Sequence, residues 1–196
     1  MTNDAASRLA PLPAAEWSEE ERAILRGNLA RADRYLSGDP DGPPVPPIIG
    51  LLARHPRVGG AWLSFSGALI EHGSLAERER ELLILRVGHR TQSRYLWSQH
   101  LAMGTEAGLD PHDLQALRDS TVTDRWHGRD RNLLMVADEL VDDHTVSDAT
   151  WSGLREYLDE QQVLEVLFLV GSYVCLAMVL NSVGLDPQLL DPQLKE

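Results

Sequence analysis

The chain has 196 residues and a formal net charge of −12, with an isoelectric point near 4.9. This length suits one domain with a sizeable core, and the negative charge disfavours partners that present phosphate backbones or anionic lipid. We therefore expect no nucleic-acid partner and no membrane partner. The single cysteine, Cys175, excludes an intramolecular disulfide, and the N-terminus lacks the basic start and apolar core of a signal peptide. These features predict a cytoplasmic protein.

Helix signals dominate the sequence and strand alternation is nearly absent, so we expect an all-α fold. The first signal is a capping box, in which the Ser18 hydroxyl accepts from the Glu21 amide while the Glu21 side chain reaches back to the Ser18 amide. The helix that this box opens is expected to run to about Leu36.

A proline-rich stretch, residues 37–47, follows this helix. It cannot be helical, because its prolines lack amide donors and bias their predecessors toward extended geometry. We place a domain border here. Residues 1–44 are predicted to form an N-terminal extension with one helix, and residues 45–196 a helical domain.

Apolar spacing and cap residues predict the helices of this domain. Ser74 with Glu77, and Asp159 with Gln162, are interpreted as the caps of two of them. The tail beyond Leu185 is expected to be an irregular surface arm. The predicted helical segments are residues 48–69, 74–90, 93–106, a short one that begins at 110–111, 130–142, 147–158 and 159–184.

The most apolar segment, from Val163 to Leu180, resembles a membrane span but is interrupted by Glu165. The uncharged run from Val166 to Leu180 would cover about 22 Å as a helix, which is short of a bilayer core of about 30 Å. The segment therefore predicts a helix that is buried on all sides, inside the subunit or between subunits.

Residues 93–100 contain the most informative pattern. At about 100° per residue, Ser93, either Leu96 or Trp97, and His100 share one face of a helix and can line one pocket. A histidine can carry a proton near neutral pH if a neighbour fixes its tautomer. Glu81, one helix earlier, is the candidate for that neighbour.

Spacing alone leaves simpler interpretations open, and these favour packing over chemistry. His100 can be a core histidine and Glu81 a solvated residue in the charged run 77–81. Arg86 could receive a substrate carboxylate with its guanidinium fork, but pairing with Glu79 or another acid is the simpler account. Trp97 is most simply a core aromatic residue.

Ligand patterns for metals and nucleotides are missing from the sequence. It contains no histidine pair at His-Glu-x-x-His spacing, no cluster of cysteine and histidine, and no glycine-rich phosphate loop after a strand. We therefore predict no metal and no cofactor.

The residues Glu81, Tyr95, Trp97 and His100 resemble a known motif. It belongs to the carboxymuconolactone decarboxylase and alkylhydroperoxidase (AhpD-like) family, in which a Glu precedes Cys-x-Tyr-x-Trp-x-x-His or Cys-x-x-Cys-x-x-x-His, and the resemblance covers roughly residues 48–185. It implies an AhpD-like helical bundle that assembles through its helices as a trimer or hexamer, with pockets between helices near subunit contacts. It also makes a functional Glu81–His100 pair the favoured interpretation.

Departures from the family pattern limit the chemistry. Ser93 and Leu96 stand where the peroxidase branch has its two cysteines, so thiol peroxidase chemistry by that route is excluded. Leu96 and Gln99 replace a Glu and a second His that are common in the decarboxylase branch. The lactone of that branch therefore need not be the substrate here.

Two functions from different classes follow, and a cofactor-independent lyase or isomerase for a small organic acid, lactone or related metabolite is favoured. In it, His100 transfers the proton and Glu81 orients the imidazole. The alternative is a non-catalytic small-molecule-binding or oligomeric scaffold protein, and residual redox chemistry at Cys175 ranks third. The predicted substrate-binding residues are Ser93, Tyr95, Trp97 and Arg86.

Overall fold

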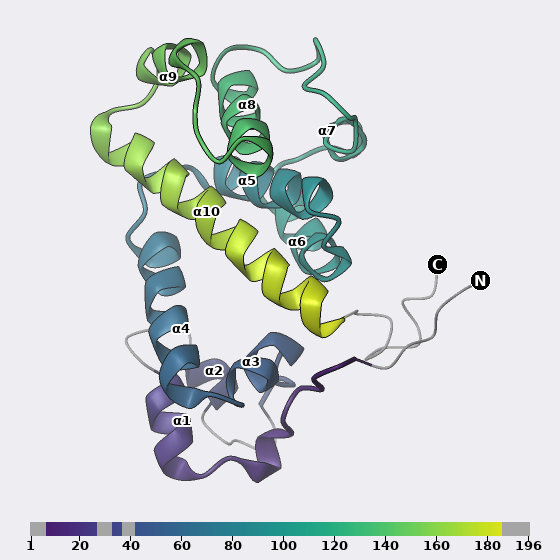
Figure 1. The fold of residues 1–196 in the computed structure, drawn as a ribbon, viewed down its shortest axis with the longest axis vertical. Coiled ribbons are helices and arrows are strands. Elements are labelled where there is room, and N and C mark those ends of the chain that lie inside the picture. The colour runs from purple at the N-terminus through teal and green to yellow at the C-terminus, as the bar shows by residue number, and fades with distance from the viewer. Residues whose placement is uncertain (1–6, 27–32, 37–41, 186–196) are drawn as a thin grey trace, which may run out of the picture. The chain divides into compact units, whose positions relative to one another are not determined.

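A computed structural model describes residues 7–26, 33–36 and 42–185. Within these ranges the ordered elements are helices and no strand is present, so the predicted all-α class is confirmed (Figure 1). The chain divides into two compact units, residues 1–73 and 74–196. The predicted tail beyond Leu185 lies outside the described residues.

The first unit opens with the predicted capping box. The Ser18 amide donates to Glu21 Oε2 at 2.8 Å, and the Glu21 amide donates to Ser18 Oγ at 3.2 Å. The predicted helix from Ser18 to Leu36 corresponds to a helix over Glu19–Arg26 and another over Asp33–Leu36. Residues 27–32, between them, lie outside the described part. The elements of this unit are η1 (Ala14–Glu16), α1 (Glu19–Arg26), α2 (Asp33–Leu36), α3 (Pro47–Leu52) and α4 (Pro56–Glu71).

One apolar core joins both sides of the border that we predicted at residues 44 and 45. Trp17 and Leu25 from before the border pack in the same cluster as Ile49 and Leu63 from after it. The N-terminal segment is therefore part of a compact unit that continues to residue 73, and the predicted border falls inside that unit. The proline-rich stretch marked a break in helix, which does not by itself divide a core.

The described part of the second unit contains six helices, and the predicted cap at Asp159 is present. The side chains of Asp110, Ser147 and Asp159 accept hydrogen bonds at the starts of three helices. Gly184 ends the last one with a left-handed φ of 71°. The six are α5 (Glu77–Arg90), α6 (Arg94–Glu106), α7 (Pro111–Ala116), α8 (Gly128–Asp142), α9 (Asp148–Arg155) and α10 (Glu160–Val183).

The start of α5 differs from the prediction. Its N-cap is Ala76, whose amide donates to the Glu79 side chain at 3.1 Å. Ser74 instead donates to Glu165 of α10, through its amide at 2.7 Å and its hydroxyl at 2.9 Å. The serine therefore ties two helices together rather than capping the one that follows it.

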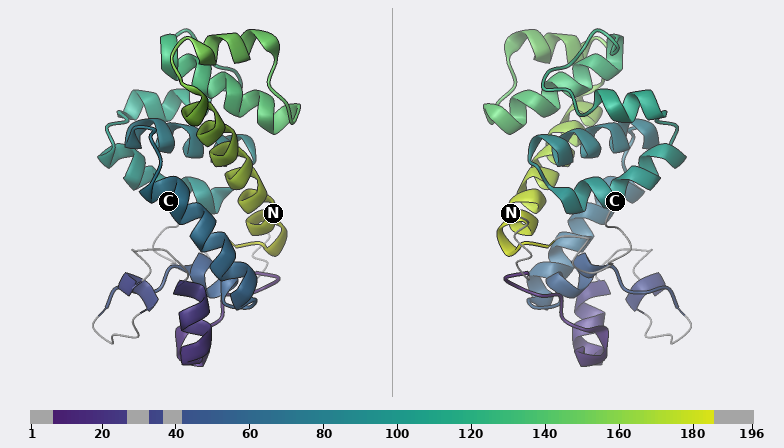
Figure 2. Two further views of the ribbon diagram at one scale, coloured as in Figure 1. Left: turned by 90° about the vertical axis from the view of Figure 1, so that its left-hand side faces the viewer. Right: turned by 90° about the vertical axis from the view of Figure 1, so that its right-hand side faces the viewer.

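Helix α5 forms the centre of this unit, and it is buried continuously from Glu81 to Gly88. It packs against α6, α8 and α10, and α10 crosses it in both Figure 1 and Figure 2. Among the described helices, α10 has the length and composition that would suit a membrane span. The helix packs on α5 and α8, but Leu164, Phe168 and Met178 are more than half exposed, so the predicted burial on all sides is not found within this chain.

Candidate functional site

The structure brings the two residues of the predicted proton-transfer pair together. His100 Nδ1 of α6 lies 2.7 Å from Glu81 Oε2 of α5. The Glu81 side chain is 1% exposed and the His100 side chain is 12% exposed. A carboxylate at this depth is stabilised by its partner, because an unpaired buried charge would cost several kcal/mol, of order 3–5.

Two glycines allow α5 and α6 to approach closely enough for this contact. A β-carbon at Gly104 would lie 2.8 Å from Leu85 Cδ1, and one at Gly88 would lie 3.3 Å from the Trp97 amide nitrogen. The turn between the helices contains Gln92 in the left-handed region, with φ of 56°. This short connection and the small residues fix the register in which Glu81 faces His100.

The contact sets the tautomer of His100. A carboxylate accepts a hydrogen bond, so Nδ1 carries the proton that it donates to Glu81, and the lone pair of a neutral ring lies on Nε2. Within the described residues Nε2 makes no hydrogen bond, and it is not one of the enclosed polar atoms that lack a partner. Nε2 is therefore the atom that can meet a ligand.

Tyr173 of α10 completes the group, although the sequence analysis did not single it out. Its ring stands edge-on to His100, with centroids 5.4 Å apart and planes at 82°. Burial, and then the charge on Glu81, raise the pKa of the Tyr173 hydroxyl, while Arg80 opposes the shift. The hydroxyl therefore stays protonated near neutral pH and can act only as a donor or a neutral acceptor.

Arg80 is the nearest positive charge to the pair. Its Nε lies 3.9 Å from Glu81 Oε1, on the oxygen that His100 does not use, and its Nη2 lies 3.4 Å from Glu77. One carboxylate oxygen of Glu81 therefore contacts the imidazole of His100, and the other lies near the guanidinium of Arg80. No local pattern marks Arg80, because it sits in a run of alternating charges.

Ser93 and Trp97 lie on the predicted face of α6, and each has a buried polar atom without a partner in the described part of the chain. These atoms are Ser93 Oγ and Trp97 Nε1. The Trp97 ring packs beside His89, at 6.1 Å, and under Arg118, at 4.6 Å. Tyr95 is buried in the core, with 3% exposure.

Arg86 has a structural position instead of the predicted place beside a substrate. Its guanidinium donates twice to Asp138 of α8, at 2.7 and 2.6 Å, and Nη1 donates to the carbonyls of Leu117 and Asp119, each at 2.8 Å. The side chain is 1% exposed. Asp138 is the other acid that the simpler interpretation allowed, and we do not carry Arg86 into the site.

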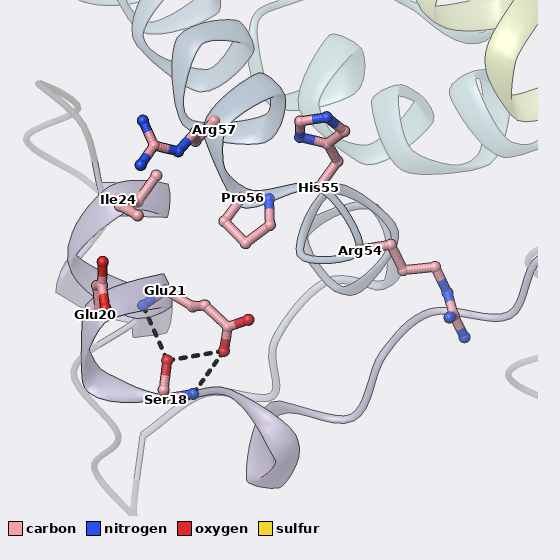
Figure 3. Close-up of a pocket in the computed structure, with 8 residues that line it drawn as sticks. All are labelled: Ser18, Glu20, Glu21, Ile24, Arg54, His55, Pro56 and Arg57. Atoms are coloured by element: carbon pink, nitrogen blue, oxygen red, sulfur yellow. Dashed lines mark hydrogen bonds between the residues drawn. The ribbon is translucent and has the colours of Figure 1, made fainter.

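A hollow of about 480 Å³ lies in the first unit, where α1 meets the turn between α3 and α4. Figure 3 draws the residues that line it. The hollow is open and of mixed charge, and none of the predicted site residues lines it. Among the residues that the structure describes, no group of three or more His, Cys, Asp or Glu side chains could hold a metal ion. The lining residues are Ser18, Glu20, Glu21, Ile24, Arg54, His55, Pro56 and Arg57.

Comparison with known proteins places this geometry in context. Residues 56–139 match the model of the carboxymuconolactone decarboxylase family. No curated protein sequence matches the chain. The matched residues run from α4 to α8 and include both members of the Glu81–His100 pair.

Two solved structures share the fold. An uncharacterized peroxidase-related protein from Silicibacter sp. TM1040 superposes with a TM-score of 0.72 at 18% identity, covering 94% of this chain and 93% of that chain. A protein of unknown function from Agrobacterium tumefaciens, proposed to be an antioxidant defence protein AhpD, gives a TM-score of 0.63 at 13% identity, covering 68% and 92%. The predicted AhpD-like helical fold is therefore confirmed.

Proposed function

Because residues 56–139 match the model of the carboxymuconolactone decarboxylase family, we propose that this chain is a cofactor-independent lyase or isomerase. Its substrate would be a small organic acid, lactone or related metabolite. The observation that carries the proposal is the 2.7 Å contact between His100 Nδ1 and buried Glu81. This contact leaves the second ring nitrogen free to move a proton.

In the proposed reaction His100 Nε2 removes a proton from a carbon next to a carbonyl group. The C–H electrons move into the carbonyl to give an enolate, and the ring becomes an imidazolium that Glu81 stabilises through Nδ1–H. In isomerisation the imidazolium returns the proton to a different carbon. Atoms balance, because the proton that leaves one carbon arrives at another.

In decarboxylation His100 and Glu81 would only donate a proton to the substrate, without first removing one from carbon. The bond between carbon and carboxylate breaks, carbon dioxide leaves, and the electron pair moves into a conjugated carbonyl of the substrate. His100, which has taken a proton from water at Nε2 beforehand, then delivers that proton to the carbon that lost the carboxylate. The substrate must supply this electron sink itself, for example as a β-keto or unsaturated acid.

Tyr173 is the proposed donor to the developing oxyanion. Its ring lies against His100, and its hydroxyl makes no hydrogen bond to the described residues and is not one of their enclosed atoms without a partner. A neutral donor held beside the base can stabilise an enolate oxygen without adding a competing charge. The unpartnered hydroxyl of Ser93 is a second candidate, provided that the substrate reaches the start of α6.

Substrate turnover and carbon-bound proton exchange test the proposal together. Purified protein is incubated in D₂O with a panel of small lactones and of β-keto and unsaturated acids, and NMR follows product and deuterium at carbon. We expect H100A to lose about 10²–10⁴-fold in kcat/KM, and E81Q to lose kcat with little change in KM. Tyr173→Phe should lower kcat without abolishing exchange.

The matched control is His112→Ala, which removes an exposed histidine from α7. It should leave turnover unchanged. Full activity in both H100A and E81Q on a substrate that the wild type converts would contradict the acid-base assignment.

A non-catalytic binding or scaffold protein is the second candidate, favoured by one specific feature. Leu96, which stands at a cysteine position of the peroxidase branch, is only 2% exposed, so packing has replaced a reactive group. A small molecule that copurifies unchanged, together with no exchange across the panel, would favour this candidate over the enzyme.

A further inference from the structure

Arg80 has weaker partners than the other arginines of α5. Its Nη2 lies 3.4 Å from the Glu77 carboxylate, and its Nε lies 3.9 Å from the nearer oxygen of Glu81. The Glu77 side chain is 68% exposed, so water competes for this ion pair, and exposed pairs contribute little. Arg80 can therefore exchange this partner for another anion. The other three arginines of α5 each form a closer ion pair with an aspartate of α8, and they are Arg78, Arg86 and Arg90.

The Arg80 guanidinium still has N–H groups to offer. A guanidinium carries five of them, and the hydrogen bond found for this side chain among the described residues runs from Nη2 to Glu77. Nε and Nη1 make none, and neither is one of the enclosed polar atoms that lack a partner. If the exposed Glu77 side chain moves into solvent, Nη1 and Nη2 form a fork that matches the two oxygens of a carboxylate.

Arg80 lies beside the groups that carry the proposed proton transfer. Its Nε approaches one oxygen of Glu81, while the other oxygen lies 2.7 Å from His100 Nδ1. Burial, and then the charge on Glu81, raise the pKa of Tyr173, and Arg80 lowers it, so the guanidinium also acts on that hydroxyl. Because the arginine and the imidazole contact opposite oxygens of one carboxylate, a small molecule can meet both at once.

We infer that Arg80 binds a carboxylate of the substrate and thereby selects small organic acids over neutral lactones and esters. The inference rests on the proposed function, because it places the anion beside the same imidazole. The carboxylate takes the place of Glu77 on Nη1 and Nη2, and the carbon that exchanges its proton faces His100 Nε2. Arg80 thus has the role that the sequence offered to Arg86. A net charge of −12 disfavours anions near this protein, so an acid needs a local cation to bind.

The carboxylate on Arg80 holds the substrate and does not itself react. Loss of carbon dioxide removes the negative charge from a carboxyl group, and an ion pair would stabilise that charge before the reaction more than during it. A substrate for decarboxylation would therefore carry two carboxylates, one on Arg80 and one that leaves. A substrate for isomerisation needs only the first.

Binding of an acid and of its methyl ester tests the site without requiring turnover. The probes are levulinate, a keto acid that does not lose carbon dioxide spontaneously, and methyl levulinate, and ligand-observed NMR gives the Kd of each. The wild type should bind the acid more tightly than the ester, by about ten-fold or more. Arg80→Met should lose that preference and leave the Kd of the ester unchanged, which also shows that the variant is folded.

Three further variants separate carboxylate binding from a structural role. Arg80→Lys keeps the charge without the fork and should keep part of the preference for the acid. Glu77→Gln removes the competing carboxylate and should tighten acid binding by about two- to five-fold, a gain that a structural role for Arg80 does not predict. Arg57→Met is the matched control, because it removes an exposed arginine from α4, and it should change neither Kd.

The outcomes distinguish this inference from the proposed function. Equal affinity of the wild type for acid and ester, no binding of the acid, or an unchanged preference in Arg80→Met would overturn the carboxylate site. Acid binding that depends on Arg80, without turnover or proton exchange, would support the site and remove the proposed function. Turnover of neutral lactones that is insensitive to Arg80→Met would support the proposed function and overturn the site.

Discussion

Removal of the Asp138 carboxylate should leave the buried positive charge of Arg86 without its partner. Arg86 is 1% exposed and Asp138 is 17% exposed, and they share two hydrogen bonds of 2.7 and 2.6 Å. Deleting one partner of a buried ion pair costs about 3–5 kcal/mol. Two carbonyl acceptors of Arg86 remain, so we expect Asp138→Ala to lose about 3 kcal/mol, the lower end of that range.

Urea unfolding followed by circular dichroism measures this loss of free energy, and thermal unfolding followed in the same way measures the midpoint temperature. The thermal midpoint should fall by about 6–12 °C, since about 2–4 °C accompanies each kcal/mol in a chain of this size. The double change Arg86→Met with Asp138→Leu is the control and should recover most of the stability, because the apolar pair leaves no charge unpaired. A loss below about 1 kcal/mol for Asp138→Ala would refute a structural role for Arg86.

The remaining predictions concern pH and helix packing. Burial, and then the charges of three neighbouring arginines, lower the pKa of His89. The unfolded chain therefore binds this proton more readily, so the free energy of unfolding should fall as pH drops below about 6.5, and His89→Asn should flatten that slope in urea titrations at several pH values. Gly60→Ala should destabilise the first unit, since its β-carbon would lie 2.1 Å from the Ile24 carbonyl oxygen. Gly171→Ala should instead stabilise the chain by about 0.5–1 kcal/mol, because no described atom lies within 4 Å of the new β-carbon. If both glycine variants melt at the wild-type temperature, the packing argument is wrong.

Local chemistry made much of the fold predictable. The boxes at Ser18 and Asp159, and the stop at Gly184, depend on atoms within a few residues of one another, so their sequence patterns carry the information. The Glu81–His100 contact was also foreseen, because a motif resemblance linked two residues that lie 19 apart.

Long-range partners were the part that the sequence could not supply. Ser74 was expected to cap the next helix, yet its acceptor, Glu165, lies 91 residues away. The partner of Arg86 lies 52 residues away on α8. Tyr173 escaped notice for the same reason, since only the packing of α10 on α5 brings its ring to His100. Packing determines which distant residues meet, and the spacing of apolar residues within one helix does not say which other helix it will contact.

Tyr173 belongs to an unbroken helix of 24 residues, and its ring stands edge-on to His100 of α6. Because α10 is one continuous helix, its faces move together. A sideways displacement of α10 would therefore move the phenol of Tyr173 relative to the imidazole of His100. A change in the position of α10 would then alter the affinity for ligand, and a bound ligand would oppose that change by the same free energy. A loss of ligand affinity in variants that weaken the contacts of α10 with α5 would be the signature of that linkage.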